Sequence, residues 1–250
     1  MPTPPEQTLK FFVYVMESPS ATDIYDGRSE GGCLGQVLKL NNIRCVTRTA
    51  VNKPAFVSAL YTGLAEAINA ETGKQPILHI SAHGSTDGIQ LTDGSIVSWD
   101  ELRELLKPVN KALNGRLVVC MSSCKGYMGT RMAMEQLQQE YPFFALVGSG
   151  DSPTWSETAV GFSTFYHQMV RGSHVSAAVA VMRAASGHAH FFVEWAEIAR
   201  RNYHNAVGAM SFGALAQASQ ALRTAERDGT KLGRGLFDNQ PVPAPAGQFH

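Results

Sequence analysis

The sequence predicts an α/β fold with a mostly parallel central sheet and helices on both faces. First, short apolar runs of strand type alternate along the chain with segments whose apolar residues recur at helical spacing. Second, the chain of 250 residues is long enough to bury one large core. Third, 44% of residues are hydrophobic and 17% are charged, which is a globular balance. In such folds, ligand chemistry lies at the carboxyl ends of the strands.

The predicted strands are short runs in which almost every residue is apolar, as expected of strands covered on both faces. They are residues 9–16, 43–47, 76–82, 116–121 and 143–147. A hairpin follows the third run, because two alternating segments are joined through Asp93 and Gly94, a pair that tolerates the positive φ angles of a tight turn.

The helices are predicted from apolar spacing and from residues that suit helix ends. Asn52 and Pro54 begin one helix, which continues to Gly73. Ser98 and Glu101 form a capping box for another, which Pro108 kinks or ends. Other predicted helices lie around residues 34–40, 131–139, 159–171 and 173–186. Residues 18–32 are predicted as a polar loop, and 190–226 as one or two helices, with 190–195 equally compatible with a strand.

Domain organisation and partners follow from composition. We expect a flexible leader over residues 1–8, a single domain over 9–226 and a flexible tail over 227–250. Lys plus Arg and Asp plus Glu each number 21, so no basic field favours nucleic acid. The sequence lacks a signal-peptide pattern and a long apolar run, so we expect a cytoplasmic protein without a membrane span.

A histidine and a cysteine each follow a predicted strand directly. His83 and Gly84 end one strand, and Cys124 comes soon after another. If the two strands are neighbours, a thiol nucleophile and an imidazole base meet at one sheet edge. The backbone amides of Gly84 and Cys124 are then candidates for an oxyanion hole.

Cysteine and histidine also have simpler, structural roles in proteins. An intracellular cysteine is often a small buried hydrophobe, and a histidine is often a hydrogen-bonded core residue. We expect this of Cys120 and His79, which lie inside apolar strands. A metal site built from Cys120, Cys124 and His79 or His83 matches no common zinc spacing, so neither a metal nor another cofactor is predicted.

The blocks ILHISAHG and RLVVCMSSCKG resemble the two active-site blocks of the caspase-like cysteine peptidases. The hairpin after His83 and the segment from residue 143 to 187 resemble the CHAT branch, so the resemblance covers about residues 9–187. It implies a three-layer caspase-like sandwich. It also implies a cysteine endopeptidase that cleaves proteins through a His83–Cys124 dyad.

The chain departs from the true caspases around the aspartate-binding pocket. Arg28 vaguely resembles one of the basic groups of that pocket. Ser122 and Ser156 stand where caspases have a Gln and another Arg. The resemblance therefore does not extend to cleavage after acidic residues.

Acidic residues near the expected pocket favour a basic residue before the cut bond. Asp151 lies in the segment that resembles the family's specificity loop, and Asp23 and Asp26 lie on the first loop. A partly desolvated carboxylate makes strong hydrogen bonds to a guanidinium or ammonium group. Trp155 of the same loop is a further candidate for substrate binding.

The resemblance also implies a biological setting. Bacterial CHAT peptidases commonly take part in defence or suicide responses, and an endopeptidase in such a role requires control. We therefore expect activation by a partner protein or by a small signal, such as a nucleotide derivative. The alternative is an inactive caspase-like scaffold that only binds a ligand or partner.

Overall fold

The computed structural model describes residues 10–134, 139–209, 213, 217 and 220. The expected leader (1–8) and tail (227–250) lie outside these residues. The chain divides into two compact units, residues 1–201 and 202–250. In the second unit, residues 202–209 are helical. The remainder of this description concerns the first unit.

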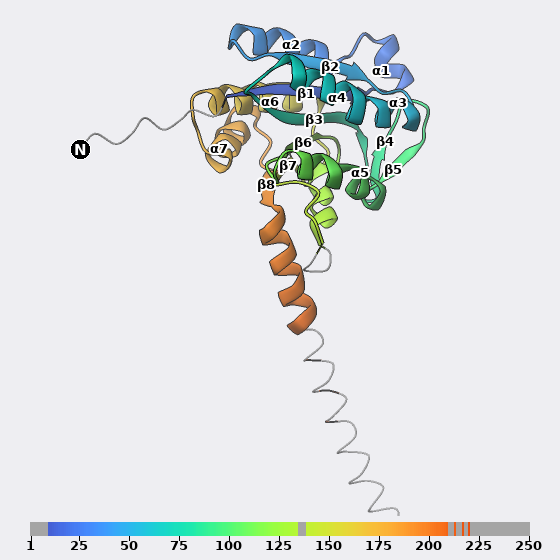
Figure 1. The fold of residues 1–250 in the computed structure, drawn as a ribbon, viewed down its shortest axis with the longest axis vertical. Coiled ribbons are helices and arrows are strands. Elements are labelled where there is room, and N and C mark those ends of the chain that lie inside the picture. The colour runs from blue at the N-terminus through green and yellow to red at the C-terminus, as the bar shows by residue number, and fades with distance from the viewer. Residues whose placement is uncertain (1–9, 135–138, 210–212, 214–216, 218–219, 221–250) are drawn as a thin grey trace, which may run out of the picture. The chain divides into compact units, whose positions relative to one another are not determined.

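The centre of the first unit is a sheet in which five strands run parallel (Figure 1). Along the sheet the order is β2-β1-β3-β6-β7-β8, and β8 pairs antiparallel with β7. These strands are β1 (Phe11–Ser18), β2 (Cys45–Thr49), β3 (Gln75–Gly84), β6 (Val118–Ser122), β7 (Ala145–Ser149) and β8 (Phe191–Trp195). The predicted α/β fold with a mostly parallel sheet is confirmed.

Alternation along β1 explains why helices cover both faces of the sheet. Phe12, Tyr14 and Met16 join the core beneath α3 (Lys53–Ser58), α4 (Leu64–Ala70) and α5 (Trp99–Ala112). The residues between them face the opposite core, beneath α2 (Glu30–Leu40), α6 (Trp155–Val170) and α7 (Val175–Ser186). Since side chains in a strand alternate between faces, an unbroken apolar run requires two cores.

The hairpin after β3 is formed by β4 (Gly88–Gln90) and β5 (Ile96–Ser98), as predicted. Gly94 has a φ of 84° in the turn between them. β4 pairs with the last two residues of β3, His83 and Gly84. The hairpin therefore fixes the end of the strand that carries the candidate base.

The segment 18–32 was predicted as a polar loop, but it contains helix α1 (Ala21–Tyr25) and the start of α2. Ser20 and Asp23 form a capping box for α1, and the Ser29 side chain accepts from the Gly32 amide to cap α2. Local caps thus create helical turns that have no apolar periodicity.

The helix predicted from Asn52 to Gly73 is interrupted by a π-helical turn, η1 (Ala59–Gly63). The Tyr14 hydroxyl donates to the Ala59 carbonyl at 2.7 Å. A Cβ atom on Gly63 would lie 2.4 Å from that hydroxyl. The buried tyrosine accounts for the wider turn, because it both engages a helix carbonyl and occupies the space beside Gly63.

Pro108 was predicted to kink or end its helix. It does not end the helix, because α5 continues to Ala112. Asn110 holds the last turn by accepting from the Leu117 amide and donating to the Tyr141 carbonyl.

In the region predicted as helix 131–139, residues up to Ala133 belong to the 3₁₀ helix η2 (Gly126–Ala133), and 135–138 lie outside the described residues. Residues 191–195 form strand β8, and 196–201 are helical.

Within the described residues, no helix combines the length and hydropathy needed to cross a bilayer.

Candidate active site

The candidate nucleophile and base lie beside one small cavity. β3 and β6 are parallel neighbours in which Ser81 pairs with Ser122, so His83 and Cys124 each lie two residues further along. Both line a cavity of about 80 Å³. Its other walls include Pro19, Glu30, Ser81, Ala82, Ser122, Ser123, Pro153, Trp155 and Thr158. The structure therefore brings together the two residues expected from their positions after the strands.

Gly84 allows the two strand ends to approach closely. A Cβ atom there would lie 2.3 Å from the Cys124 carbonyl oxygen and 2.9 Å from the Ser123 Cβ. Only glycine fits without moving the backbone that carries the thiol. The oxyanion roles of the Gly84 and Cys124 amides stay predictions.

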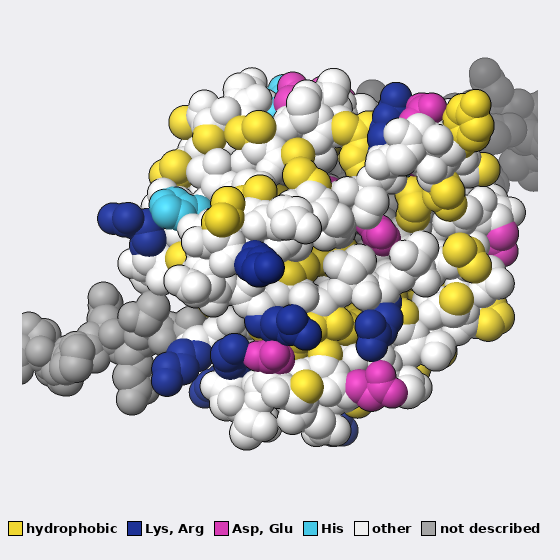
Figure 2. All heavy atoms as spheres, turned by 90° about the horizontal axis from the view of Figure 1, so that it is seen from above, with side chains coloured by type: hydrophobic (Ala, Val, Ile, Leu, Met, Phe, Trp, Pro, Cys, Tyr) yellow, Lys and Arg dark blue, Asp and Glu magenta, His cyan; other side chains and the backbone are white. Residues whose placement is uncertain are grey.

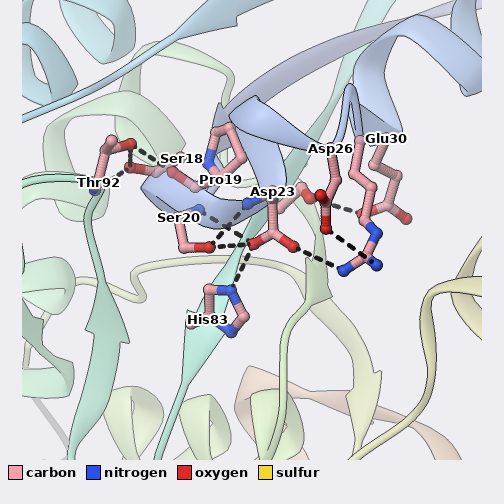
Figure 3. A network of polar contacts seen from close by, with 10 residues as sticks. Ser18, Pro19, Ser20, Asp23, Asp26, Glu30, His83 and Thr92 are labelled. Atoms are coloured by element: carbon pink, nitrogen blue, oxygen red, sulfur yellow. Dashed lines mark hydrogen bonds and ion pairs between the residues drawn. The ribbon is translucent and has the colours of Figure 1, made fainter.

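The His83 imidazole is held by the carboxylate of Asp23 in the short helix α1 (Figure 3). Nε2 of His83 lies 2.8 Å from Oδ2 of Asp23, whose side chain is only 5% exposed. The same carboxylate accepts from the Ser20 amide and hydroxyl. Asp23, expected near the substrate, is thus already engaged by the candidate base.

Burial alone would raise the pKa of the Asp23 carboxyl. Hydrogen bonds from Ser20 and His83 outweigh burial and lower that pKa to about 2. Asp23 is therefore an anion that accepts hydrogen bonds at neutral pH. The group facing it, His83 Nε2, must carry the hydrogen.

The two other residues expected on this loop are paired with each other. Arg28 lies 3.2 Å from Asp26 and 3.4 Å from Asp23, and its side chain is half exposed. Neither Arg28 nor Asp26 is among the described residues that line the cavity. Their charges offset each other, and their substrate roles stay predictions.

Asp151 ties its loop to the segment that carries Cys124. The Lys125 amide donates to the Asp151 carbonyl at 2.8 Å, and Lys125 Nζ lies 3.1 Å from the Asp151 carboxylate. That ion pair lowers the pKa of Asp151, which is solvent exposed. Among the described residues of this loop, Pro153 and Trp155 line the cavity, whereas Asp151 does not.

Glu30 is a cavity residue that the sequence reasoning missed. It is the first residue of α2, and its carboxylate accepts from Ser81 at 2.6 Å and from Ser122 at 2.8 Å. The residue is 3% exposed and lines the cavity beside Cys124. The available signal was Ser29 followed by an acidic residue, which is a helix-start pattern inside the segment predicted as a loop.

The Glu30 carboxylate is ionised despite its burial. Burial raises its pKa, but interaction with His79 and hydrogen bonds from Ser81 and Ser122 outweigh burial, so the pKa lies below its usual value. His79 Nε2 is 3.6 Å from Oε1, beyond hydrogen-bond distance, so that contact is electrostatic. Glu30 thus places negative charge in the wall of the cavity.

His79 and Cys120 are core residues, as predicted, and both are fully buried. His79 Nδ1 lies 2.9 Å from the Tyr166 hydroxyl. Burial raises the pKa of Cys120 to about 12, which keeps it a thiol. No cluster of three or more His, Cys, Asp or Glu side chains in the described part of the chain is arranged to hold a metal ion.

Figure 2 shows one face of the molecule with its charged side chains. Lys and Arg side chains form a loose row across part of this face, and Asp and Glu side chains lie among them. Charge of one sign therefore does not cover this face.

Comparison with known proteins gives a fold-level likeness only. No family model and no curated protein matches the sequence. Among solved structures, the chain is similar to the Arg-specific cysteine proteinase gingipain R, at 10% identity and a TM-score of 0.45, over 70% of this chain and 41% of that one. It is also similar to the complex of the pro- and mature domains of RgpB from Porphyromonas gingivalis, at 10% identity and a TM-score of 0.45, over 78% and 49%. The matched regions span less than half of each proteinase chain.

Proposed function

We propose that the protein is a cysteine endopeptidase of caspase-like fold, with Cys124 as nucleophile and His83 as general base and acid. The observation that carries this proposal is the shared cavity: the thiol and an imidazole anchored by a carboxylate line the same opening. A nucleophile and a base beside the same opening are the minimal parts for covalent acyl transfer.

The proposed reaction has two stages. The thiol proton passes to Nδ1 of His83 as Sγ attacks the scissile carbonyl carbon, and the imidazolium then protonates the leaving amine as the C–N bond breaks. Water next gives a proton to the imidazole and attacks the thioester. The acid is released as Cys124 regains its proton. The amides of Gly84 and Cys124 are proposed to stabilise the oxyanion in both stages.

We propose a preference for Arg or Lys before the cut bond, now resting on Glu30. Its ionised carboxylate lies in the wall of the cavity that contains Cys124 and Trp155. A cationic side chain entering there gains a charge-assisted hydrogen bond and contact with an indole face. Such a bond is worth about 1.5 to 3 kcal/mol, or about one to two decades in selectivity.

Activation by a partner protein or a signalling ligand is part of the proposal. The cavity of about 80 Å³ is small beside the roughly 300–1,000 Å³ of typical ligand pockets. Its walls come partly from the segments around Pro19 and Pro153, which lie between regular elements. Movement of these walls would admit a long side chain, and an activator that favours the open form would raise activity. A cytoplasmic bacterial defence or suicide response remains the proposed setting.

A mapped labelling experiment tests the proposal. The purified chain, with and without candidate activators, is treated with a peptide-based thiol electrophile, and the modified cysteine is identified by mass spectrometry. We expect modification at Cys124 and loss of peptide cleavage in Cys124→Ala, while Cys33→Ala, which removes an exposed thiol, retains activity. Normal cleavage by Cys124→Ala would refute the mechanism.

The alternative is an inactive scaffold that binds a ligand or partner. It predicts a rise in the unfolding midpoint on binding, because a ligand of the folded form stabilises it, but no turnover under any condition. Cleavage of any peptide that requires Cys124 decides against this alternative.

A further inference from the structure

The carboxylate of Asp23 lies directly behind the cavity residue His83 and is held by several hydrogen bonds. Its Oδ2 atom is within hydrogen-bond distance of the Ser20 amide at 3.1 Å, the Ser20 hydroxyl at 2.5 Å and His83 Nε2 at 2.8 Å. Its other oxygen, Oδ1, faces Arg28 Nη1 at 3.4 Å. The His83 side chain, by contrast, is 48% exposed. A half-exposed imidazole is therefore held in place mainly by a buried anion.

The segment that carries Asp23 is hydrogen-bonded to neighbouring loops (Figure 3). The Thr92 hydroxyl donates to the Pro19 carbonyl at 2.7 Å, and the Thr92 amide donates to the Ser18 hydroxyl. Ser18 in turn donates to the Ala50 carbonyl at 2.5 Å. These bonds connect the β1–α1 segment to the hairpin that pairs with the end of β3, so Asp23 and His83 share one framework.

The direction of the hydrogen bond fixes the tautomer of His83. A carboxylate only accepts, so the hydrogen lies on Nε2 and the lone pair of the neutral ring lies on Nδ1. In Figure 3, the second ring nitrogen points away from Asp23. Nδ1 has no hydrogen-bond partner among the described residues and is the nitrogen left to exchange a proton with the thiol.

We propose that Asp23 is a positioning residue for His83, which makes the site a Cys–His–Asp triad rather than a dyad. This inference rests on the proposed function for its effect on catalysis. Its effect on the His83 tautomer does not depend on any peptidase activity. Asp23 would hold the ring orientation, keep the reactive lone pair on Nδ1 and stabilise the imidazolium formed during attack.

The first test is spectroscopic and independent of turnover. In ¹⁵N-histidine-labelled protein carrying Cys124→Ala, we expect neutral His83 to be the Nε2–H tautomer. Adding Asp23→Asn should shift the population towards Nδ1–H, because an amide can donate to Nε2. An unchanged tautomer would overturn the proposal, whatever the outcome for peptidase activity.

The second test uses kinetics with matched controls. In the active chain, Asp23→Asn should lower kcat by about 10²- to 10⁴-fold with little change in KM. The other charged or titratable groups at the cavity, Glu30 and Cys124, are unchanged in this variant. Asp23→Glu should restore part of the activity.

Asp100→Asn is the matched control, because Asp100 pairs with Arg103 at the surface of α5 and is not among the described residues that line the cavity. It should keep activity within about twofold. Ser20→Ala removes the helix cap and a hydrogen-bond donor to Asp23 but leaves the carboxylate. Its activity therefore shows how much of the loss in Asp23→Asn comes from a weakened α1. Activity of folded Asp23→Asn equal to that of Asp100→Asn would overturn the inference. If Cys124→Ala loses activity but Asp23→Asn does not change the His83 tautomer, the proposed function stands and the triad is refuted.

Discussion

Gly84 and Cys124 are in such close contact that a single added carbon at Gly84 would lie 2.3 Å from the Cys124 carbonyl oxygen. The contact joins the end of β3 to the loop after β6, so it brings together the backbone segments that carry the candidate base and nucleophile. Replacing Gly84 therefore tests whether that approach is needed for activity.

Gly84→Ala should abolish cleavage and lower the free energy of unfolding by about 1–3 kcal/mol, because backbone atoms must move apart. Gly35→Ala is the control, since a Cβ on Gly35 within α2 meets no atom within 4 Å and alanine favours helix. Urea unfolding and peptide cleavage are measured on both. Full activity in Gly84→Ala would mean that the strand ends separate freely in the active form.

Glu30→Gln removes the cavity charge while keeping the shape and an acceptor for Ser81 or Ser122. We expect the ratio of kcat/KM for Arg or Lys over a neutral residue to fall about 10- to 100-fold. Glu17→Gln is the matched control, because Glu17 is a buried carboxylate bonded to Ser29 and Gly31 that is not among the described cavity residues.

Profiling with a mixed peptide library compares Glu30→Gln, Glu17→Gln and Asp151→Asn. A loss of basic preference confined to Asp151→Asn would return the specificity role to Asp151. Cuts after small apolar residues in the unmodified protein would exclude both carboxylates.

His188 supports the wall that contains Trp155. The Ser149 hydroxyl lies 2.8 Å from His188 Nε2, and His188 Nδ1 lies 3.6 Å from Glu157, the capping-box residue of α6. His188→Ala should raise KM several-fold and lower the unfolding midpoint by about 2–4 °C, because a buried hydrogen bond is lost.

His190→Ala is the control for His188→Ala. The carbonyl of residue 190, which accepts from the Gly150 amide, is retained in that variant. Unchanged KM and midpoint in His188→Ala would show that the wall does not depend on this bond.

Acid should weaken the fold through Asp23. The folded-state pKa of Asp23 is about 2, below the ordinary value of about 3.9, so its contribution is present above pH 4 and is lost as pH falls towards 2. That contribution is on the order of 2 kcal/mol.

Urea unfolding at pH 6 and pH 3 should therefore show a smaller loss of stability in Asp23→Asn than in the unmodified chain. Glu30, whose pKa is also lowered, acts in the same direction in both proteins. Equal acid losses in the two proteins would mean that Asp23 does not contribute to the acid sensitivity.

The strands and the meeting of His83 with Cys124 could be predicted because they depend on local patterns. Apolar runs such as residues 9–16 bury both faces, and strands in chain order often become neighbours. The turn at Gly94 was equally local. These features need no knowledge of distant contacts.

The contacts of Asp23 and Glu30 could not be predicted in this way. Asp23 contacts a histidine 60 residues away, and Glu30 contacts Ser122 across 92 residues. Both acids lie in a polar segment whose five-residue helix α1 is too short to show periodicity. The π turn η1 was hidden for a related reason, because it depends on the Tyr14 hydroxyl from another strand.

Lys125 joins the nucleophile segment to the wall of the cavity through its amide, its ammonium group and its left-handed backbone with a φ of 56°. Because Gly150 and Asp151 accept these bonds, the wall and the thiol form one mechanical unit. In the proposed mechanism, a side chain that displaces the wall also changes the angle at which the Cys124 sulfur meets the substrate carbonyl carbon. In a peptidase built this way, a poorly fitting substrate is discriminated against mainly in the rate of bond cleavage, and only secondarily in its affinity.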